Sequence, residues 1–505
     1  MPVLVRIAFR NMREHKAKSL IIGILVALGV IVIVVGNAMM DASAAGIRRT
    51  FIESYTGDLM VHGPSESAVS VFGVESFSMD ADTQVPTIPE YEKVLARVRA
   101  DSRVAAATSM AVAYGLLAAD ADETIVDSSG DEGNVSFAIV FGVEAETYFD
   151  MFPSIILVRG RFLETGESAI LLNQDQLDKL AKKYEREFDV GDKILLSGFG
   201  TAGMRIREVE IVGVITRKEM QDEGPPLVIS DIDTVRVLGG LTLAGTESID
   251  LDASQTALLS AADADAIFGD DLFSGDMVDS SIAAAAPASF DSAASLLGDT
   301  SKRELLNTAD SGAWNFILLR LSDSGTASAA MADLKTQFAA DGIDARIEDW
   351  KGAAGTNGKI ADIVRIVFNI ALVVIAVVSV IIMMNTLVIS VIERTSEIGT
   401  MRALGAKKSF IRSMFLTETL TLTIVFGFIG SAIALAAIGI LNALKIPAAN
   451  DFMRLLFGGA TLTLTPRIGS FIGTIAMVFA VGYLAHLYPV AVALKIQPVA
   501  AMRSE

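Results

Sequence analysis

Four long apolar segments are distributed unevenly along this chain of 505 residues. The first lies near the start (19–40), and the other three fall within the last part of the chain (366–391, 420–444 and 468–492). Each is as long as the roughly 20 residues that a helix needs to cross about 30 Å of hydrocarbon. A long polar segment separates the first from the second. We therefore expect a polytopic α-helical membrane protein with four transmembrane helices in a 1+3 layout and one large domain on one side of the membrane.

The net charge of −19 is the sum of two opposite parts. Residues outside 41–365 contain 15 Lys and Arg against 6 Asp and Glu, whereas residues 41–365 contain 26 against 54. Basic residues near membrane helices mark the cytoplasmic side. They gather in the first 18 residues, in the link between the second and third apolar segments, and in the tail. Both termini are therefore expected in the cytoplasm, and the acidic domain is expected outside, in a periplasm or an equivalent compartment. So acidic a domain is not expected to bind nucleic acid, because phosphate contacts need a basic surface.

The start of the chain has two features at the membrane. Residues 2–18 have the pattern of a basic amphipathic helix that lies in the headgroup plane. Ala42-Ser43-Ala44 has the form of a signal-peptide cleavage site. However, the apolar segment before it is longer than the 7–15 residues of a signal peptide. We expect an uncleaved transmembrane anchor at 19–41.

The polar segment at 42–360 is expected to form an α+β extracytoplasmic domain. Strand–helix–strand units recur at both of its ends, and strand patterns at about 155–235 suggest a β subdomain inserted between them. Residues 240–300 are rich in Ala, Ser and Asp and indicate an insertion. The chain has no cysteine, so disulfides, zinc–thiolate sites and cysteine catalysis are excluded. Three scattered histidines and no distinguished carboxylate pair give no catalytic or metal site.

The segment after the second apolar segment, residues 391–416, has the most specific pattern. Ile398, Met401 and Leu404 recur every three residues, charged residues lie between them, and Gly405 is a typical helix end. One interpretation is a helical hairpin whose long charged side chains reach to the membrane surface. The other is a short rigid helix, within a cytoplasmic coupling segment at 392–413, that is presented to a cytosolic partner.

This segment resembles the FtsX-like permeases, in which the string E-R-x-x-E-I-G-x-x-R-A-x-G-A follows the second transmembrane helix. The matching residues are Glu393, Arg394, Glu397, Ile398, Gly399, Arg402, Ala403, Gly405 and Ala406. Short pieces of the polar segment resemble the MacB-type periplasmic core domain, namely 55–58, 160–161, 190–192 and 212–214. A permease domain is then expected at 361–505, with transmembrane helices at 366–391, 414–444 and 468–492.

The resemblance implies a non-catalytic permease subunit of an ABC transporter of the MacB/LolCDE/FtsX superfamily, in a bacterial inner membrane. Its layout is closest to the lipoprotein-releasing LolC/LolE-type permeases. A separate cytosolic ATPase dimer would hold ATP and Mg²⁺, and this chain would hold no cofactor. A second permease copy or a paralogue would complete the complex. The motif residues Glu393, Arg394, Glu397, Ile398, Gly399, Met401, Arg402 and Gly405 would couple the ATPase to the membrane helices.

Some residues inside the apolar segments are candidates for helix packing. Gly23 and Ala27 form a small-xxx-small pair, which is also a possible dimer contact. Asn369 and Asn385 are expected to hydrogen-bond either across a helix interface or locally. Glu418 lies about one turn into the third helix, where a structural role is expected.

Three functions are kept open. The first is release of a lipoprotein or another amphiphile from the outer leaflet, by motion passed through a stiff helix at about 360–398. The second is MacB-like export of a periplasmic peptide or small molecule. The third is FtsX-like signalling to a cell-wall enzyme.

Overall fold

The computed structural model describes residues 16–75, 84–119, 136–200, 203–218, 226–243, 307–449 and 460–495, together with isolated residues near 6–14 and 453–457. It divides into two compact units. The helical unit comprises Met1–Glu53, Lys218–Glu223 and Thr356–Glu505, and the β-rich unit comprises Ser54–Arg217 and Gly224–Gly355. The expected amphipathic helix at 2–18 and insertion at 240–300 lie almost entirely outside the described residues.

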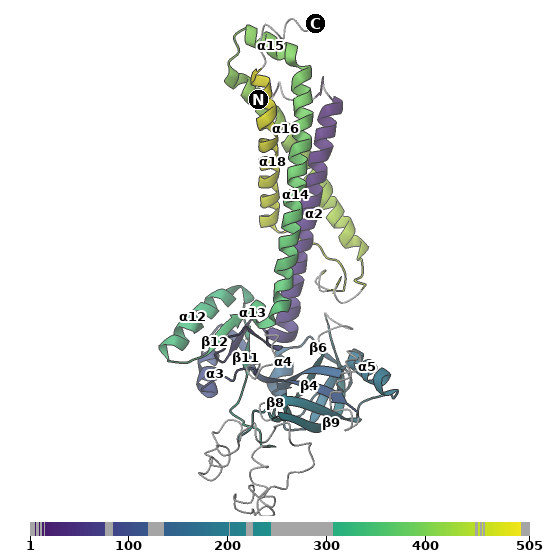
Figure 1. Cartoon of the computed structure of the whole chain (residues 1–505), viewed down its shortest axis with the longest axis vertical. Coiled ribbons are helices and arrows are strands. Elements are labelled where there is room, and N and C mark those ends of the chain that lie inside the picture. Colours follow the sequence, from purple (N-terminus) through teal and green to yellow (C-terminus); the bar gives the residue numbers. More distant parts are fainter. Residues whose placement is uncertain are drawn as a thin grey trace, which may run out of the picture. The chain divides into compact units, whose positions relative to one another are not determined.

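The helical unit contains four long helices: α2 (Lys16–Phe51), α14 (Thr356–Glu393), α16 (Lys408–Leu444) and α18 (Ile468–Lys495) (Figure 1). All four are long and apolar enough to cross a membrane. The expected spans at 19–41, 366–391, 414–444 and 468–492 lie inside them. α2 has 36 residues and α14 has 38. At 1.5 Å per residue they extend about 54 and 57 Å, so both are longer than a membrane crossing needs.

Close packing within the helical unit depends on small residues, as is usual between membrane helices. A Cβ atom built on Gly23 of α2 would lie 2.3 Å from the ring of Phe426 on α16. One built on Gly430 of α16 would lie 2.7 Å from the carbonyl oxygen of Ala27. Side chains of α2, α14, α16 and α18 form one apolar core, which includes Ile22, Val26, Met383, Ala434 and Ala485.

The described part of the β-rich unit contains one ten-stranded sheet and a small hairpin. The strands run in the order β12-β1-β11-β4-β5-β10-β7-β9-β6, and β8 pairs with both β4 and β9. Their bounds are β1 Leu59–His62, β4 Val104–Ala118, β5 Ser136–Val143, β6 Ile155–Gly160, β7 Ala169–Asn173, β8 Lys193–Gly200, β9 Gly203–Arg217, β10 Leu227–Asp231, β11 Phe316–Leu321 and β12 Arg346–Asp349; the hairpin is β2 Val69–Ser70 with β3 Gly73–Val74. The helices are α3 Tyr91–Arg99, α4 Ala145–Met151, α5 Gln174–Tyr184, α6 Ile232–Gly239, α12 Ala327–Ala340 and α13 Trp350–Ala354.

The double pairing of β8 closes part of the sheet into a ring of strands, β4-β5-β10-β7-β9-β8. The ring closes because β4 and β9 are each 15 residues long and change partners along their length. Where β8 meets β4, Gly115 lies opposite Gly198, and a Cβ atom on Gly115 would lie 2.6 Å from the carbonyl oxygen of Ser197. Closure leaves the ring strands without a free edge.

The ring changes the expected division of the outer domain. Residues 155–235 supply β6 to β10 and α6, and these strands join the same sheet as β1, β11 and β12 through β4 and β5. The strand patterns expected within about 155–235 are found as β6 to β10. The sequence did not indicate that β4 and β9 each change pairing partners along their length.

Candidate functional site

The candidate site is the short helix α15 (Thr395–Ala403), which follows α14 after one residue, Arg394. It ends as the sequence predicts, at Gly405, whose φ of +94° belongs to the left-handed region. The Ala406 N–H donates to the carbonyl of Met401 and the Gly405 N–H donates to that of Arg402. These two bonds are those of a Schellman motif, which satisfies the last carbonyl groups of a helix.

Arg394 joins α15 to the next membrane helix. Its side chain is only 7% exposed. The guanidinium donates from Nε to Oε2 of Glu397 at 3.1 Å and from Nη1 to both carboxylate oxygens of Glu418 on α16, at 3.3 and 3.1 Å. Its carbon atom Cζ lies 5.8 Å from the centre of the Phe415 ring. The end of α14, the start of α15 and the first turns of α16 are therefore held together by one buried cation.

An apolar cluster packs against the buried side of α15. Ile398 is 1% exposed and packs with Val391 of α14, with residues of α16, and with Val490 and Ala493 of α18. Gly399 is buried beside it, and Met401 is partly buried against the same cluster. Because α14, α16 and α18 all contribute, α15 is fixed to three of the long helices and not to one.

The opposite side of α15 is exposed. Glu397 and Ala403 lie on it, Glu393 at the end of α14 is also exposed, and Leu404 is 84% exposed. The expected apolar stripe of Ile398, Met401 and Leu404 is therefore wrong at its last member. Leu404 is the C-cap residue, where the chain turns toward Gly405, so its side chain no longer follows the helical face. Arg402 is half-buried. The motif thus contributes an anchored face and an outward face with one large apolar side chain.

The candidate packing residues fall into three groups. Gly23 and Ala27 lie where α2 packs against α16 of the same chain. Asn369 and Asn385 are exposed on α14, most of which is exposed along its apolar length. Glu418 is 14% exposed and pairs with Arg394.

A second polar cluster, which the sequence analysis did not single out, lies at the opposite end of the helical unit. Asp41 of α2, 7% exposed, accepts from Nη2 of Arg365 on α14 at 2.9 Å and from Oγ of Ser470 on α18 at 2.5 Å. Nearby, Asn37 donates to Thr474 at 3.2 Å. An acid and a base directly at the ends of two apolar segments, Asp41 after 19–40 and Arg365 before 366–391, were the available signal, since charges beside hydrocarbon are costly unless paired.

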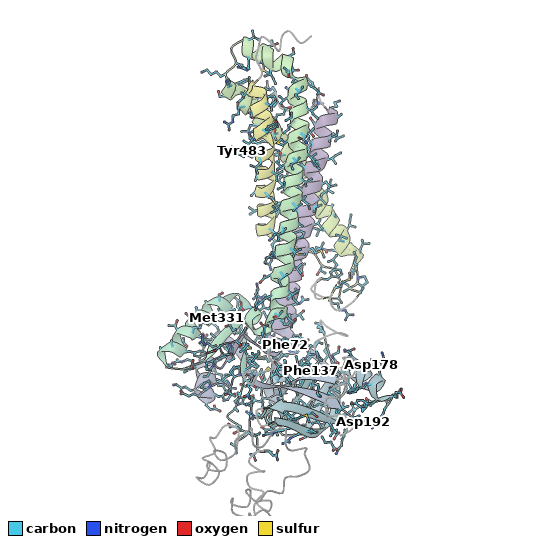
Figure 2. All side chains as sticks on the ribbon, in the orientation of Figure 1. Phe72, Phe137, Asp178, Asp192, Met331 and Tyr483 are labelled. Atoms are coloured by element: carbon cyan, nitrogen blue, oxygen red, sulfur yellow. The ribbon has the colours of Figure 1, made fainter. Side chains whose placement is uncertain are left out.

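Aromatic residues lie in the C-terminal half of α18. The Tyr483 and His486 rings have centroids 4.9 Å apart, and Tyr483 is 46% exposed on the outside of the helix (Figure 2).

Within the described residues no group of three or more His, Cys, Asp or Glu side chains is placed to hold a metal ion. The interactions that the structure shows at α15 are apolar packing and ion pairing.

Matches to two protein-family models together cover most of the chain. The model of the MacB-like periplasmic core domain matches residues 20–337, and that of the FtsX-like permease C-terminal domain matches residues 369–498. The first match alone covers more than half of the sequence. The chain belongs to the MacB-like periplasmic core domain family. As a member of this family it also carries the FtsX-like permease C-terminal domain, and α15 lies within that domain.

Several relatives share a shorter stretch with this MacB-like family member. The uncharacterized ABC transporter permease YvrN of Bacillus subtilis is 37% identical over 122 residues, which are 24% of this chain and 26% of YvrN. The pyoverdine export ATP-binding/permease protein PvdT of Pseudomonas syringae is 35% identical over 122 residues, 24% of this chain and 16% of PvdT. These stretches are about a quarter or less of each relative's length. The periplasmic region of MacB from Actinobacillus actinomycetemcomitans superposes with a TM-score of 0.30 at 11% identity, over 60% of this chain and 92% of that one.

Proposed function

We propose that this chain is the permease subunit of an ATP-driven ABC transporter in a bacterial inner membrane, with α15 as the contact for a separate cytosolic ATPase. The chain itself is then non-catalytic, and ATP and Mg²⁺ bind to the ATPase dimer. Both termini face the cytoplasm and the β-rich unit lies outside. A second copy of the chain, or a paralogue, completes the complex.

The observation that carries this proposal is the buried Arg394. A helix that receives force from a partner must not slide on its own support, and Arg394 fixes α15 to α16 through Glu418 while Ile398 fixes it to α18. The outward residues, Glu397 and Leu404 among them, are left to meet the partner. The motif therefore divides into a support side and a contact side.

The length of α14 supplies the connection to the outside. α15 follows its cytoplasmic end, and the chain enters the β-rich unit at its other end, Thr356. A continuous helix of about 57 Å passes a displacement along its axis, as helices do in hinge and shear movements. The displacement of α14 would then move the β-rich unit, and the substrate would not pass through a channel in the bilayer.

The names of two relatives, PvdT and MacB, indicate which class of substrate this chain would transport. PvdT is named for pyoverdine export and MacB for macrolide export. They favour export of a small molecule or peptide over the lipoprotein release expected from the layout of the chain. In this proposal the substrate is amphiphilic and is handled on the outer side of the membrane.

The test combines two substitutions with one control. The full chain is reconstituted with a candidate cytosolic ABC ATPase from the same organism, and ATP hydrolysis is measured with and without the chain. Replacing Glu393 and Arg402 together, as E393Q/R402Q, is expected to weaken binding of the ATPase and to remove its stimulation. Lys182→Gln, at an exposed position on α5, is the control and should change neither. Unchanged binding and stimulation in the double variant would refute the assignment of α15.

A further inference from the structure

An apolar groove opens on the surface of the helical unit, lined by residues of α2, α16 and α18. Its volume is about 310 Å³, at the lower end of the range for small-molecule sites. Its lining includes Val30 of α2, Gly427 and Phe428 of α16, and Phe471, Ile475 and Phe479 of α18. Gly427 widens the groove, because the nearest atom to a Cβ built there is Cγ1 of Val478, at 3.7 Å.

The groove lies within the apolar length of these helices and faces outward. Phe428 is 72% exposed and Phe479 is 40% exposed on its rim. The hydroxyl of Thr474, at its edge, is already bonded to the carbonyl oxygen of Ser470 and to Asn37. Since bilayer hydrocarbon contains no water, the groove needs an apolar occupant that is present in the membrane.

A cation, Arg467, immediately precedes α18. Its carbonyl oxygen accepts from the N–H of Phe471, so Arg467 lies at the start of the helix, one turn from Phe471. Arg467 is exposed, and no ion pair to it is found within the described part of the chain. Phe471 and Phe479 lie about 6 and 18 Å along the helix from Arg467 at 1.5 Å per residue, close to the ~15 Å depth of one leaflet.

The end of the unit at which Arg467 lies is the end where Asp41, Arg365 and Ser470 meet. The chain enters the β-rich unit from α2 and α14 at that same end. The groove therefore belongs to the leaflet on the side of the β-rich unit, whichever way the protein is oriented.

We propose that this groove is a binding site for an anionic phospholipid of that leaflet, with one acyl chain between α16 and α18 and the phosphate at Arg467. The acyl chain fits the apolar walls, and the headgroup meets a cation that is worth about 1 kcal/mol to an anionic lipid near a membrane surface. The site is formed by this chain alone, so it does not depend on the partner ATPase or on transport.

The test uses the full chain in nanodiscs of phosphatidylcholine that contain phosphatidylglycerol with a photoreactive diazirine on one acyl chain. Labelled peptides are quantified by mass spectrometry after illumination. In the wild type we expect labelling in the segments that contain Phe428 and Phe479. Gly427→Leu fills the groove and should lower that labelling about tenfold, equivalent to ~1.4 kcal/mol.

Gly439→Leu is the matched control, because Gly439 is on the same helix with nothing within 4 Å of its Cβ position. It should keep wild-type labelling. Arg467→Gln should keep labelling by a phosphatidylcholine probe but lose most of the preference for phosphatidylglycerol, whereas Lys445→Gln should not. If Gly427→Leu does not fold, Ile475→Trp closes the groove from α18 instead.

Two results would overturn the proposal. One is equal lipid labelling of the Gly427→Leu and Gly439→Leu variants. The other is cross-linking of the groove segments to a second copy of the chain in place of lipid, which would show that the groove is a subunit interface. Because no ATPase is present, neither result bears on the proposed coupling role of α15.

Discussion

Glu418→Gln isolates the contribution of the buried ion pair at α15. The substitution keeps the size of the side chain and removes its charge. The Arg394–Glu418 pair is 7% and 14% exposed, so solvent screens it little. A hydrogen bond to a charged group contributes about 1.5–3 kcal/mol, and we expect α15 to open more easily by that amount. A change of that size in the free energy of opening raises the population of the open state about 10- to 150-fold.

Hydrogen exchange of the backbone amides of α15 measures that population directly, because exchange follows local opening. The amides of Thr395–Ala403 should exchange about 10- to 150-fold faster in Glu418→Gln, while those of the β-rich unit stay unchanged. Glu397→Gln is the matched control. It removes the other partner of Arg394, but Glu397 is 60% exposed, so a cost of about 0–1 kcal/mol is expected.

The size of the effect also distinguishes pairing from packing. Arg394→Met leaves Glu418 buried without its cation and should cost about 3–5 kcal/mol. Adding Glu418→Met should recover much of this loss, since a buried pair is often replaced by apolar residues at little cost. Equal exchange of the α15 amides in wild type and Glu418→Gln, or equal effects of Glu418→Gln and Glu397→Gln, would refute the reasoning.

Three more outcomes are expected. Gly405→Ala should cost about 1–2 kcal/mol because an L-residue is forced into the left-handed region, and faster exchange at the end of α15 would show it. Gly23→Ala should lower the melting temperature of the detergent-purified chain, since the Phe426 ring must move, whereas Gly29→Ala, with nothing within 4 Å, should not. Burial lowers the pKa of His62, so the folded state resists the proton that the unfolded state takes up near pH 6.5. Stability is therefore fully present above pH 6.5 and falls as the pH drops below it; His62→Asn should flatten the change in melting temperature between pH 7.5 and 5.5.

Local features of the site followed from the sequence more readily than its contacts. The end of α15 at Gly405 could be predicted, because only one residue type favours that backbone conformation. The partner of Arg394 could not, since Glu418 lies 24 residues away and their meeting depends on how α14, α15 and α16 pack. Leu404 was misassigned because helical spacing does not show where the last turn ends.

In the β-rich unit, too, local elements could be predicted from the sequence and their contacts could not. Its strands were visible as apolar and β-branched segments, but the ring of strands was not, because it depends on β4 and β9 changing partners midway. The meeting of Asp41 with Arg365 and Ser470 was also missed. Helix length fixes which residues lie near one membrane surface, but it does not fix which helices are neighbours there.

The central claim is that nucleotide binding by the ATPase, passed on through α15 and α14, moves the β-rich unit relative to the start of α18. The chain has no cysteine, so Lys182→Cys on α5 and Ile468→Cys at the start of α18 can be spin-labelled in the assembled complex. α18 is not joined in sequence to the β-rich unit, so the distance between the labels reports movement of that unit against the helices. The account predicts distinct distance distributions in the nucleotide-free and ATP-trapped states. The same distribution in both states, in a complex that hydrolyses ATP at the normal rate, would contradict it.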